Sequence, residues 1–369
     1  MAQWKAHHRR ICKAYNRYNI SSEYQALSVN EKVDAVLLSQ VLIQLYPNDQ
    51  FDLTPSTDGD PLAATFSDLL ESSAQVDPPP LCRTSKSAAV PRDTIRKIFS
   101  RFGNNNFILH SHLNTYAHGV YPMASRFFNH SCTPNCVAKY IIAPQQVVKM
   151  ELVALHNIAA GDELTIPYLD PALPYETRQD ALQSNYGFQC ACQLCIFQGR
   201  IQPIPPLPST LPETSHLWDR LRAFVDSMGD SQDNPLVFAI SEELYPFLND
   251  TCLPDLSEQF TRSSHEGEFD IAILTGKRLL ALYRMIYPRN FPQIGMHALE
   301  LAKTAWNAVV TMEHKADLSV VQSFADEARA SVLIASRVLN NFGIEGDEGG
   351  PLEEIRILQG LLSEERALP

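Results

Sequence analysis

Five cysteines in two short blocks constrain this chain more than any other feature. Residues 126–136 read RFFNHSCTPNC, and Cys190, Cys192 and Cys195 follow later in a C-x-C-x2-C pattern. Three thiolates at such close spacing suit a tetrahedral zinc ion and leave one coordination position open. Cys132 or Cys136 of the first block can fill that position. The metal would then tie together two segments that are distant in sequence.

Two other interpretations of these cysteines are a disulfide and a set of free thiols. A bond between Cys190 and Cys192 is geometrically awkward at this spacing. The eight cysteines of the chain are clustered rather than spread as a framework, which fits a reducing compartment and metal binding better than disulfides. We therefore favour zinc. Four thiolates fill its coordination shell, so this ion would be structural and not catalytic.

The charge balance argues against nucleic acid as a direct partner. The chain carries 30 basic and 42 acidic side chains, a formal net charge of −12. An acidic surface repels phosphates and tolerates a basic protein tail, so a DNA-binding zinc protein is disfavoured. No apolar run approaches the roughly 20 residues that span a bilayer, and the N-terminus lacks a signal-peptide pattern. We expect a protein of the cytoplasm or the nucleus that does not enter the membrane.

The first half of the chain alternates helical and strand patterns. With 369 residues and 45% hydrophobic content, the chain can build at least two cores. Apolar spacing predicts helices over 22–46 and 94–102, with a loop at 47–61 between them. Strands are expected from Phe107 onward and most clearly over 147–158, where β-branched residues are dense.

A proline-rich spacer separates this half from a helical region. Five prolines lie within residues 203–212, which excludes a helix there. Beyond them, the patterns predict long helices over 265–287, 291–312 and 318–341. Helices of this length with short connections are typical of stacked helical hairpins, as in tetratricopeptide arrays. This interpretation rests on helix lengths alone, because the consensus letters of that repeat are missing.

The order of the motifs resembles that of a known family. The NHSC block, the segment GDELTIPY at 161–168 and the C-x-C-x2-C block resemble the C-terminal half of a SET-domain protein lysine methyltransferase. The resemblance implies an α+β fold. It consists of a β-rich SET domain with a helical insertion, a zinc-bound post-SET segment and an all-α, tetratricopeptide-like domain. It also implies S-adenosylmethionine and Zn²⁺ as cofactors, and it favours Cys132 over Cys136 as the fourth zinc ligand.

The resemblance assigns catalysis to Tyr168. The catalytic tyrosine of SET proteins occupies this place in the motif, where its hydroxyl would orient the attacking lysine amine. Without the flanking motifs, a tyrosine at a strand end would be interpreted as a core residue. The chain departs from the pattern at Pro167, where related proteins usually carry a small polar residue. Proline removes a backbone donor and fixes φ, which would alter hydrogen bonding at the rim of the lysine channel.

Four further residues are assigned to S-adenosylmethionine. The Asn129 amide can hold the amino-acid end of the cofactor, and His130 can engage the adenine through its backbone. Tyr186 and Phe188 would be held over the pocket by the neighbouring zinc, with Phe188 stacking on the adenine ring. A lone Asn-His dipeptide would be interpreted as an ordinary turn, so these roles depend on the neighbouring motifs.

Two positions complete the predicted site. Asn105 falls where the family places a polar residue near the cofactor, and Phe107 where it places an aromatic residue near the lysine channel. The run of three asparagines at 104–106 leaves this register open by one residue.

The N-terminus resembles the end of a MYND zinc finger. Trp4, His8 and Cys12 form a W-x3-H-x3-C pattern, which points to the SET-and-MYND group. Alone, His8 and Cys12 would bind zinc poorly, so a basic solvated helix is the preferred interpretation. The other finger ligands and the glycine-rich cofactor loop are expected upstream. We therefore expect Met1 to be an internal methionine of a longer protein.

Six segments and one activity follow from these patterns. The segments are a MYND remnant (1–12), a helical connector with the SET insertion (13–102), the SET core (103–185), the post-SET zinc segment (186–200), the linker (201–212) and the α-helical domain (213–369). The predicted activity is protein-lysine N-methylation of a lysine-containing protein, histone or non-histone, by a monomer. The alternative is a non-enzymatic interaction scaffold with a degenerate or incomplete SET domain.

Overall fold

The computed structural model describes residues 9–46, 65–72, 77–82, 90–111, 114–143, 146–227, 240–312, 317–346 and 349–365. The chain forms two compact units. The first contains residues 1–129, 142–149 and 180–189, and the second contains residues 130–141, 150–179 and 190–369. The second unit therefore combines part of the predicted SET core with the whole helical C-terminal region.

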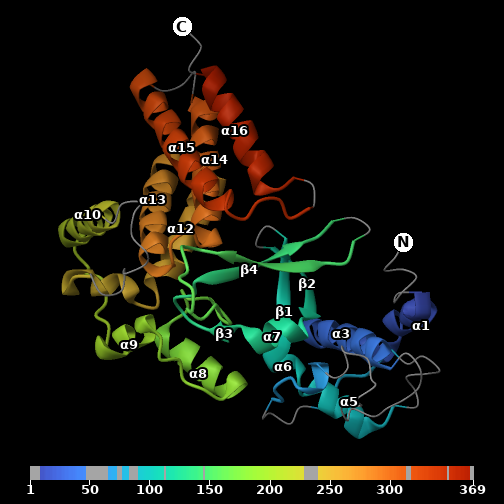
Figure 1. Ribbon diagram of the computed structural model, residues 1–369. Coiled ribbons are helices and arrows are strands. Elements are labelled where there is room, and N and C mark those ends of the chain that lie inside the picture. The colour runs from blue at the N-terminus through green and yellow to red at the C-terminus, as the bar shows by residue number, and fades with distance from the viewer. Residues whose placement is uncertain are drawn as a thin grey trace. The chain divides into compact units, whose positions relative to one another are not determined.

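Short helices and one hairpin make up the first unit (Figure 1). The elements are α1 (Arg9–Asn19), α2 (Ser22–Gln25), α3 (Val29–Leu45), α5 (Arg92–Phe99), α6 (Phe102–Asn105), β1 (Asn106–Ser111), β2 (Asn114–Val120) and α7 (Pro122–Phe127). The single helix expected over 22–46 is wrong, because Ser28 starts a new helix. Its hydroxyl caps α3, and its backbone N–H donates to the Glu31 carboxylate over 2.9 Å. The helix expected over 94–102 is likewise two helices, α5 and α6.

The hairpin of the first unit is antiparallel and irregular. β1 pairs with β2, with a register shift between Leu109 and His110. The strand expected from Phe107 is thus confirmed. The core of this unit packs α3 against α5 and α6 through buried apolar side chains, among them Leu38, Leu42, Ile98 and Phe102.

Two further strand pairs belong largely to the second unit. β3 (Asn129–His130) pairs with β6 (Thr165–Ile166), and β4 (Cys136–Ile141) pairs with β5 (Lys149–Ala154). The strand predicted over 147–158 is confirmed in its central part only. β6 ends before the tyrosine that was expected to terminate it, because Pro167 has no N–H to continue a ladder. Tyr168 therefore lies just beyond the strand.

Helices dominate the rest of the second unit. They are α8 (Tyr175–Tyr186), whose last turns belong to the first unit, α9 (Gln193–Arg200), α10 (Leu211–Ser227), the 3-10 helix η3 (Glu242–Leu248), α12 (Cys252–Glu266), α13 (Phe269–Ile286), α14 (Pro292–Met312), α15 (Leu318–Leu339) and α16 (Pro351–Glu365). The helices predicted over 291–312 and 318–341 are confirmed. The helix predicted over 265–287 begins four residues late. Gly267 takes a left-handed φ of 76° and ends α12 first.

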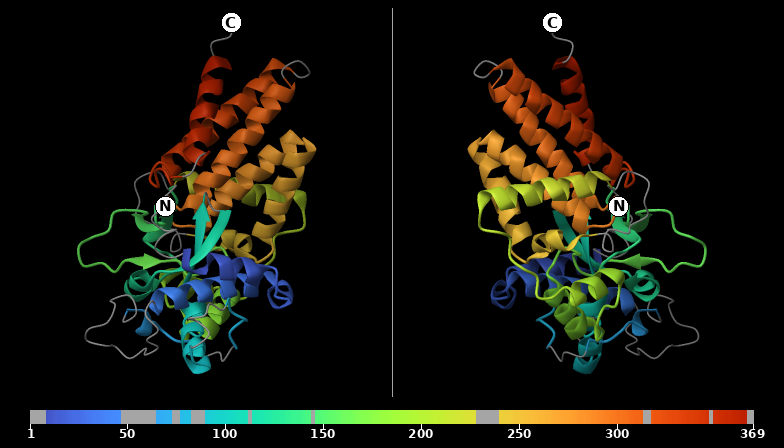
Figure 2. Two further views of the ribbon diagram at one scale, coloured as in Figure 1. Left: turned by 90° about the vertical axis from the view of Figure 1, so that its right-hand side faces the viewer. Right: turned by 90° about the vertical axis from the view of Figure 1, so that its left-hand side faces the viewer.

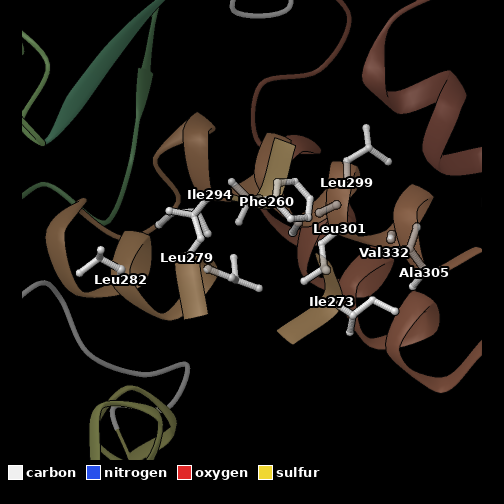
Figure 3. Close-up of a cluster of buried hydrophobic side chains, with 14 of the residues drawn as sticks. Phe260, Ile273, Leu279, Leu282, Ile294, Leu299, Leu301, Ala305 and Val332 are labelled. Atoms are coloured by element: carbon white, nitrogen blue, oxygen red, sulfur yellow. The ribbon is translucent and has the colours of Figure 1, made fainter. Parts of the chain in front are cut away.

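The five long helices α12 to α16 stack in sequence order. Each packs on the next one in the chain, and Figures 1 and 2 show α13 to α16 side by side. Phe260, Ile273, Leu301 and Val332 interdigitate between these helices (Figure 3). This sequential packing agrees with the predicted helical domain, whereas its tetratricopeptide character remains a prediction. No helix in the described ranges is long and apolar enough to cross a membrane.

The helical region and the strands of the second unit share one core. Val137 of β4 and Leu155, just after β5, belong to the same buried cluster as the long helices. Asn290, after α13, donates its side-chain amide to the Leu155 carbonyl over 2.7 Å. Tyr287 donates its hydroxyl to Asp170 over 3.2 Å. The helical region therefore braces the strands and the loop that follows Tyr168.

Candidate active site and metal centre

The second unit brings the four predicted zinc ligands together. The Sγ atoms of Cys132, Cys190, Cys192 and Cys195 lie within 4.8 Å of one another, and Cys132 and Cys195 are 3.5 Å apart. A tetrahedral zinc with Zn–S bonds of about 2.3 Å requires S···S distances of about 3.8 Å. The donor set and its spacing therefore fit zinc. Cys136 is buried in β4 and lies outside this group.

Local backbone structure explains how the C-x-C-x2-C block converges. Cys192 is the N-cap of α9, with an extended backbone (φ −65°, ψ 166°), and Cys195 lies in the first turn of that helix. Gln179 of α8 holds Cys190 with a reciprocal pair of hydrogen bonds. Its amide N–H donates to the Cys190 carbonyl, and its oxygen accepts from the Cys190 N–H, both over 2.9 Å. The helix N-terminus also carries partial positive charge, which favours thiolates.

Arg178 lies against this cluster with no exposed surface. Its Nε–H donates to Cys132 Sγ over 3.2 Å, and another guanidinium nitrogen lies 3.9 Å from Cys195 Sγ. The remaining N–H groups donate to the carbonyls of Pro171 and Leu173 and to the side chain of Gln198. One buried side chain thus joins the cysteine cluster, α9 and the loop after Tyr168.

The charges of the cluster and of Arg178 are complementary. Burial would lower the pKa of Arg178, but the thiols of Cys132 and Cys195 raise it overall, so the guanidinium stays charged. Four thiolates around Zn²⁺ carry two net negative charges, and a buried cation beside them offsets one. This complementarity is a second respect in which the residues fit a metal.

His130 connects the cluster to Tyr168. Its Nε2 lies 3.2 Å from Cys132 Sγ, and its Nδ1 accepts the backbone N–H of Tyr168 over 3.0 Å. The imidazole and phenol rings lie 5.3 Å apart between centroids, tilted by 49°. Tyr168 is half-buried, and Asn129, directly before His130, is exposed. The predicted catalytic tyrosine and the cysteine cluster thus lie on either side of one histidine.

The other predicted site residues belong to the first unit. The rings of Tyr186 and Phe188 lie 6.3 Å apart, and burial raises the pKa of the Tyr186 hydroxyl. Phe107 packs edge-on against Tyr121, with centroids 5.9 Å apart. The Asn105 amide donates to the carbonyls of Leu70 and Arg101 over 3.0 and 2.7 Å. Asn105 therefore has a structural role, and its cofactor contact stays a prediction.

The weaker alternative at the N-terminus, zinc binding by His8 and Cys12, stays a prediction. Cys12 is half-buried in α1 and is not part of the four-cysteine group. Trp4 and His8 lie outside the described residues, and the helix expected there is observed from Arg9.

Comparisons with known proteins find a SET domain and methyltransferase relatives. The SET domain family model matches residues 9–169. Histone-lysine N-methyltransferase SMYD3 of Mus musculus is 26% identical over 227 residues, which cover 58% of this chain and 50% of the relative. Histone-lysine N-methyltransferase SMYD1 of Homo sapiens is 27% identical over 238 residues, which cover 58% of this chain and 48% of the relative. A SET and MYND domain-containing protein of Dictyostelium discoideum is 40% identical over 78 residues, which cover 21% of this chain and 14% of the relative.

The chain contains a match to the SET domain family and is similar to SET-and-MYND proteins. It spans about half the length of the SMYD relatives that it matches. S-adenosylmethionine is the cofactor of SET methyltransferases, and the four-cysteine cluster is compatible with zinc, so both cofactor predictions agree with these findings.

Sequence reasoning missed three residues of this site. They are Arg178, Gln179 and Gln198, which hold the cysteines and the adjoining loop. One signal was present for Arg178. It lies three residues after Tyr175 and four before Leu182 in α8, which puts it on an apolar helix face. A charged residue on such a face indicates a buried partner of opposite charge.

Proposed function

We propose that this chain carries the catalytic region of a protein-lysine N-methyltransferase that uses S-adenosylmethionine. The observation that carries the proposal is the arrangement Cys132–His130–Tyr168. His130, which directly follows the exposed Asn129, joins the metal-binding cluster to the half-buried Tyr168. The SMYD relatives, which are named histone-lysine N-methyltransferases, support the same reaction class.

The chemistry asks for positioning more than for acid–base catalysis. When bound, S-adenosylmethionine supplies a methyl group that is already activated on a sulfonium. A free lysine has a pKa of about 10.4, so its amine must lose a proton before it can attack. An apolar channel and a neighbouring positive charge both favour the neutral amine. The protein must then exclude water and hold that amine in line with the methyl group.

Tyr168 is the proposed catalytic residue. Its backbone is tied to His130 while its side chain is half-buried, so the hydroxyl is held on a constrained segment. We assign this hydroxyl to orienting the lysine amine. Pro167 contributes by ending β6, so that the Tyr168 N–H bonds to His130 instead of to a neighbouring strand.

The cofactor contacts are proposed residue by residue. Asn129 would bind the polar end of S-adenosylmethionine, the His130 backbone its adenine, and Tyr186 with Phe188 would supply the flat apolar surface. The Tyr186–Phe188 ring pair supports the last assignment. Phe107 is assigned to the lysine channel. The zinc at Cys132, Cys190, Cys192 and Cys195 is proposed as structural, because four sulfurs leave no open position.

A lysine-bearing protein is the proposed substrate, histone or non-histone, and with it a nuclear or a cytoplasmic location. The net charge of −12 suits a basic substrate segment. We also propose that the protein acts as a monomer and that the six predicted segments are its domains.

A methyl-transfer assay tests the proposal. The chain, alone and as part of its longest natural form, is incubated with methyl-labelled S-adenosylmethionine and with lysine-containing protein substrates. Label is expected on lysine and is expected to fall with Tyr168→Phe. If no form transfers label to any lysine, the enzyme proposal fails and the interaction-scaffold alternative replaces it.

A further inference from the structure

The sulfur of Cys132 accepts hydrogen bonds from two side chains at once. His130 Nε2 and Arg178 Nε each lie 3.2 Å from Cys132 Sγ. Cys132 and Arg178 have no exposed surface, so water cannot replace either contact. A thiolate can accept several hydrogen bonds, and charge makes each of them stronger than a bond to a neutral thiol.

The geometry also determines which nitrogen of His130 carries the proton. An amide N–H can only donate, and the Tyr168 N–H points to His130 Nδ1 over 3.0 Å. Nδ1 is therefore the acceptor, and the ring proton resides on Nε2, where it points to Cys132 Sγ. His130 is thus a rigid link with the sulfur on one side and the Tyr168 backbone on the other.

Arg178 makes the corresponding link at the other end of the same segment. While its Nε–H donates to Cys132 Sγ, a terminal nitrogen donates to the carbonyls of Pro171 and Leu173. The segment from Tyr168 to Leu173 is therefore fastened at both ends by side chains that meet at one sulfur.

We propose that metal bound at the cysteine cluster sets the position of Tyr168 through two positioning residues, His130 and Arg178. Coordination keeps Cys132 a thiolate and fixes the direction of its sulfur. Both donors then hold the Tyr168–Leu173 segment in one geometry. The zinc is structural in coordination, yet it acts on the active site. The effect of this coupling on catalysis rests on the proposed function of Tyr168. The coupling between the metal and the position of Tyr168 does not depend on that function.

Three variants of His130 separate the two sides of the link. His130→Asn keeps an acceptor near Nδ1 and loses the donor to sulfur. His130→Gln keeps a donor near Nε2 and loses the acceptor for Tyr168. His130→Phe keeps a ring of similar size and loses both. Tyr287→Phe is the matched control, because it releases the same segment at Asp170 without touching the cluster.

The first readout is hydrogen exchange at the Tyr168 amide in the zinc-loaded chain, measured on overlapping peptides. Exchange should rise by about 5-fold or more in His130→Phe and in His130→Gln, the scale of one lost hydrogen bond, and less in His130→Asn. The second readout is the rate of zinc release to a chromophoric chelator. Release should be faster in His130→Phe and His130→Asn than in the parent, and unchanged in Tyr287→Phe.

The coupling shows itself when the metal is removed. Chelation should speed Tyr168 exchange in the parent far more than in His130→Phe, where the link is already broken. Peptides from α14 report whether a variant stays folded. If His130→Phe does not fold, Arg178→Lys replaces it, with the same two readouts expected to rise. Equal effects of chelation in the parent and in the link variants would overturn the proposal. Loss of coupling is also distinct from failure of the proposed function, because neither readout requires methyl transfer.

Discussion

Arg178 donates its Nε–H to Cys132 Sγ over 3.2 Å, and neither side chain is exposed to solvent. A buried guanidinium needs a compensating negative charge, because the cost of removing an ion from water is several kcal/mol. Here the cysteine cluster supplies that charge. The arginine and the cysteines consequently depend on each other, and both hold the loop that follows Tyr168.

Replacing Arg178 should destabilise the protein strongly. Arg178→Met leaves the Pro171 and Leu173 carbonyls without this donor and removes the charge that offsets the thiolates. We expect a loss of about 3–5 kcal/mol in the free energy of unfolding, measured by denaturant titration. Arg222→Met is the control, because Arg222 pairs with Asp226 at the surface with 69% of its side chain exposed. It should change stability by about 0.5 kcal/mol or less. Equal losses in the two variants would contradict the role of Arg178.

The cysteine cluster should bind one zinc ion per chain. Cys192→Ser removes one of four thiolates, so elemental analysis of purified protein should show most of the zinc lost. Cys136→Ala is the control, because Cys136 is buried but lies outside the cluster. It should retain the metal. Zinc loss from Cys136→Ala, or full retention in Cys192→Ser, would show that the ligand set is wrong.

Tyr168→Phe should separate catalysis from structure. The substitution keeps the ring that packs beside His130 and removes only the hydroxyl. We expect turnover in the methyl-transfer assay to fall by about 10²-fold, the effect of losing one preorganised contact in the transition state. The affinity for S-adenosylmethionine, the zinc content and the melting temperature should stay at the parental values. Unchanged turnover would make Tyr168 a structural residue.

Stability should decrease in acid because of His297. This side chain is 8% exposed in α14, and its Nε2 donates to the Gly276 carbonyl over 2.8 Å. Burial lowers its pKa from 6.5 to about 4, partly opposed by that hydrogen bond. The unfolded chain then binds a proton that the folded chain excludes, so stability present above pH 6.5 is lost as the pH falls toward 4.

The contribution of His297 can be isolated with one variant. Between pH 7.5 and 5.0 it should amount to about 2 kcal/mol in the free energy of unfolding. His297→Gln keeps a donor for Gly276 and should reduce the pH dependence by that amount. His265→Gln, at an exposed position in α12, should leave it unchanged. The hypothesis is wrong if the parent and His297→Gln lose stability in parallel.

Two glycines in the helical region should respond oppositely to alanine. At Gly276 in α13, an added Cβ would lie 2.8 Å from atoms of Leu301 and Phe260. Overpacking at this position should cost about 1–3 kcal/mol. At Gly360 in α16, an added Cβ meets nothing within 4 Å, so Gly360→Ala should stabilise the helix by up to about 1 kcal/mol. Thermal melts of both variants check the sign of each change in stability. A stabilising Gly276→Ala would refute the packing shown in Figure 3.

Several features follow from local sequence alone. The C-x-C-x2-C spacing brings three thiolates together within a few residues, whatever the rest of the chain does. The helices predicted over 291–312 and 318–341 appear as α14 and α15, because their apolar periodicity extends over many turns. Helix boundaries were weaker predictions. The capping serine Ser28 and the terminating Gly267 were both visible in the sequence, but they divide helices that apolar spacing alone predicts as continuous.

Only the tertiary structure decided what the site is built from. The spacing of the cysteines allows either Cys132 or Cys136 as the fourth zinc ligand. The fold brings Cys132 to the cluster and buries Cys136 in β4. The meeting of Arg178 and His130 at Cys132 Sγ depends on contacts between segments far apart in the chain. The spacing of residues and their helix propensities describe neighbours within a few turns of the chain. The burial of a charged side chain instead depends on contacts with segments that are distant in sequence. The sequence alone therefore determined which residues could bind a metal, and tertiary packing decided how that metal site connects to Tyr168.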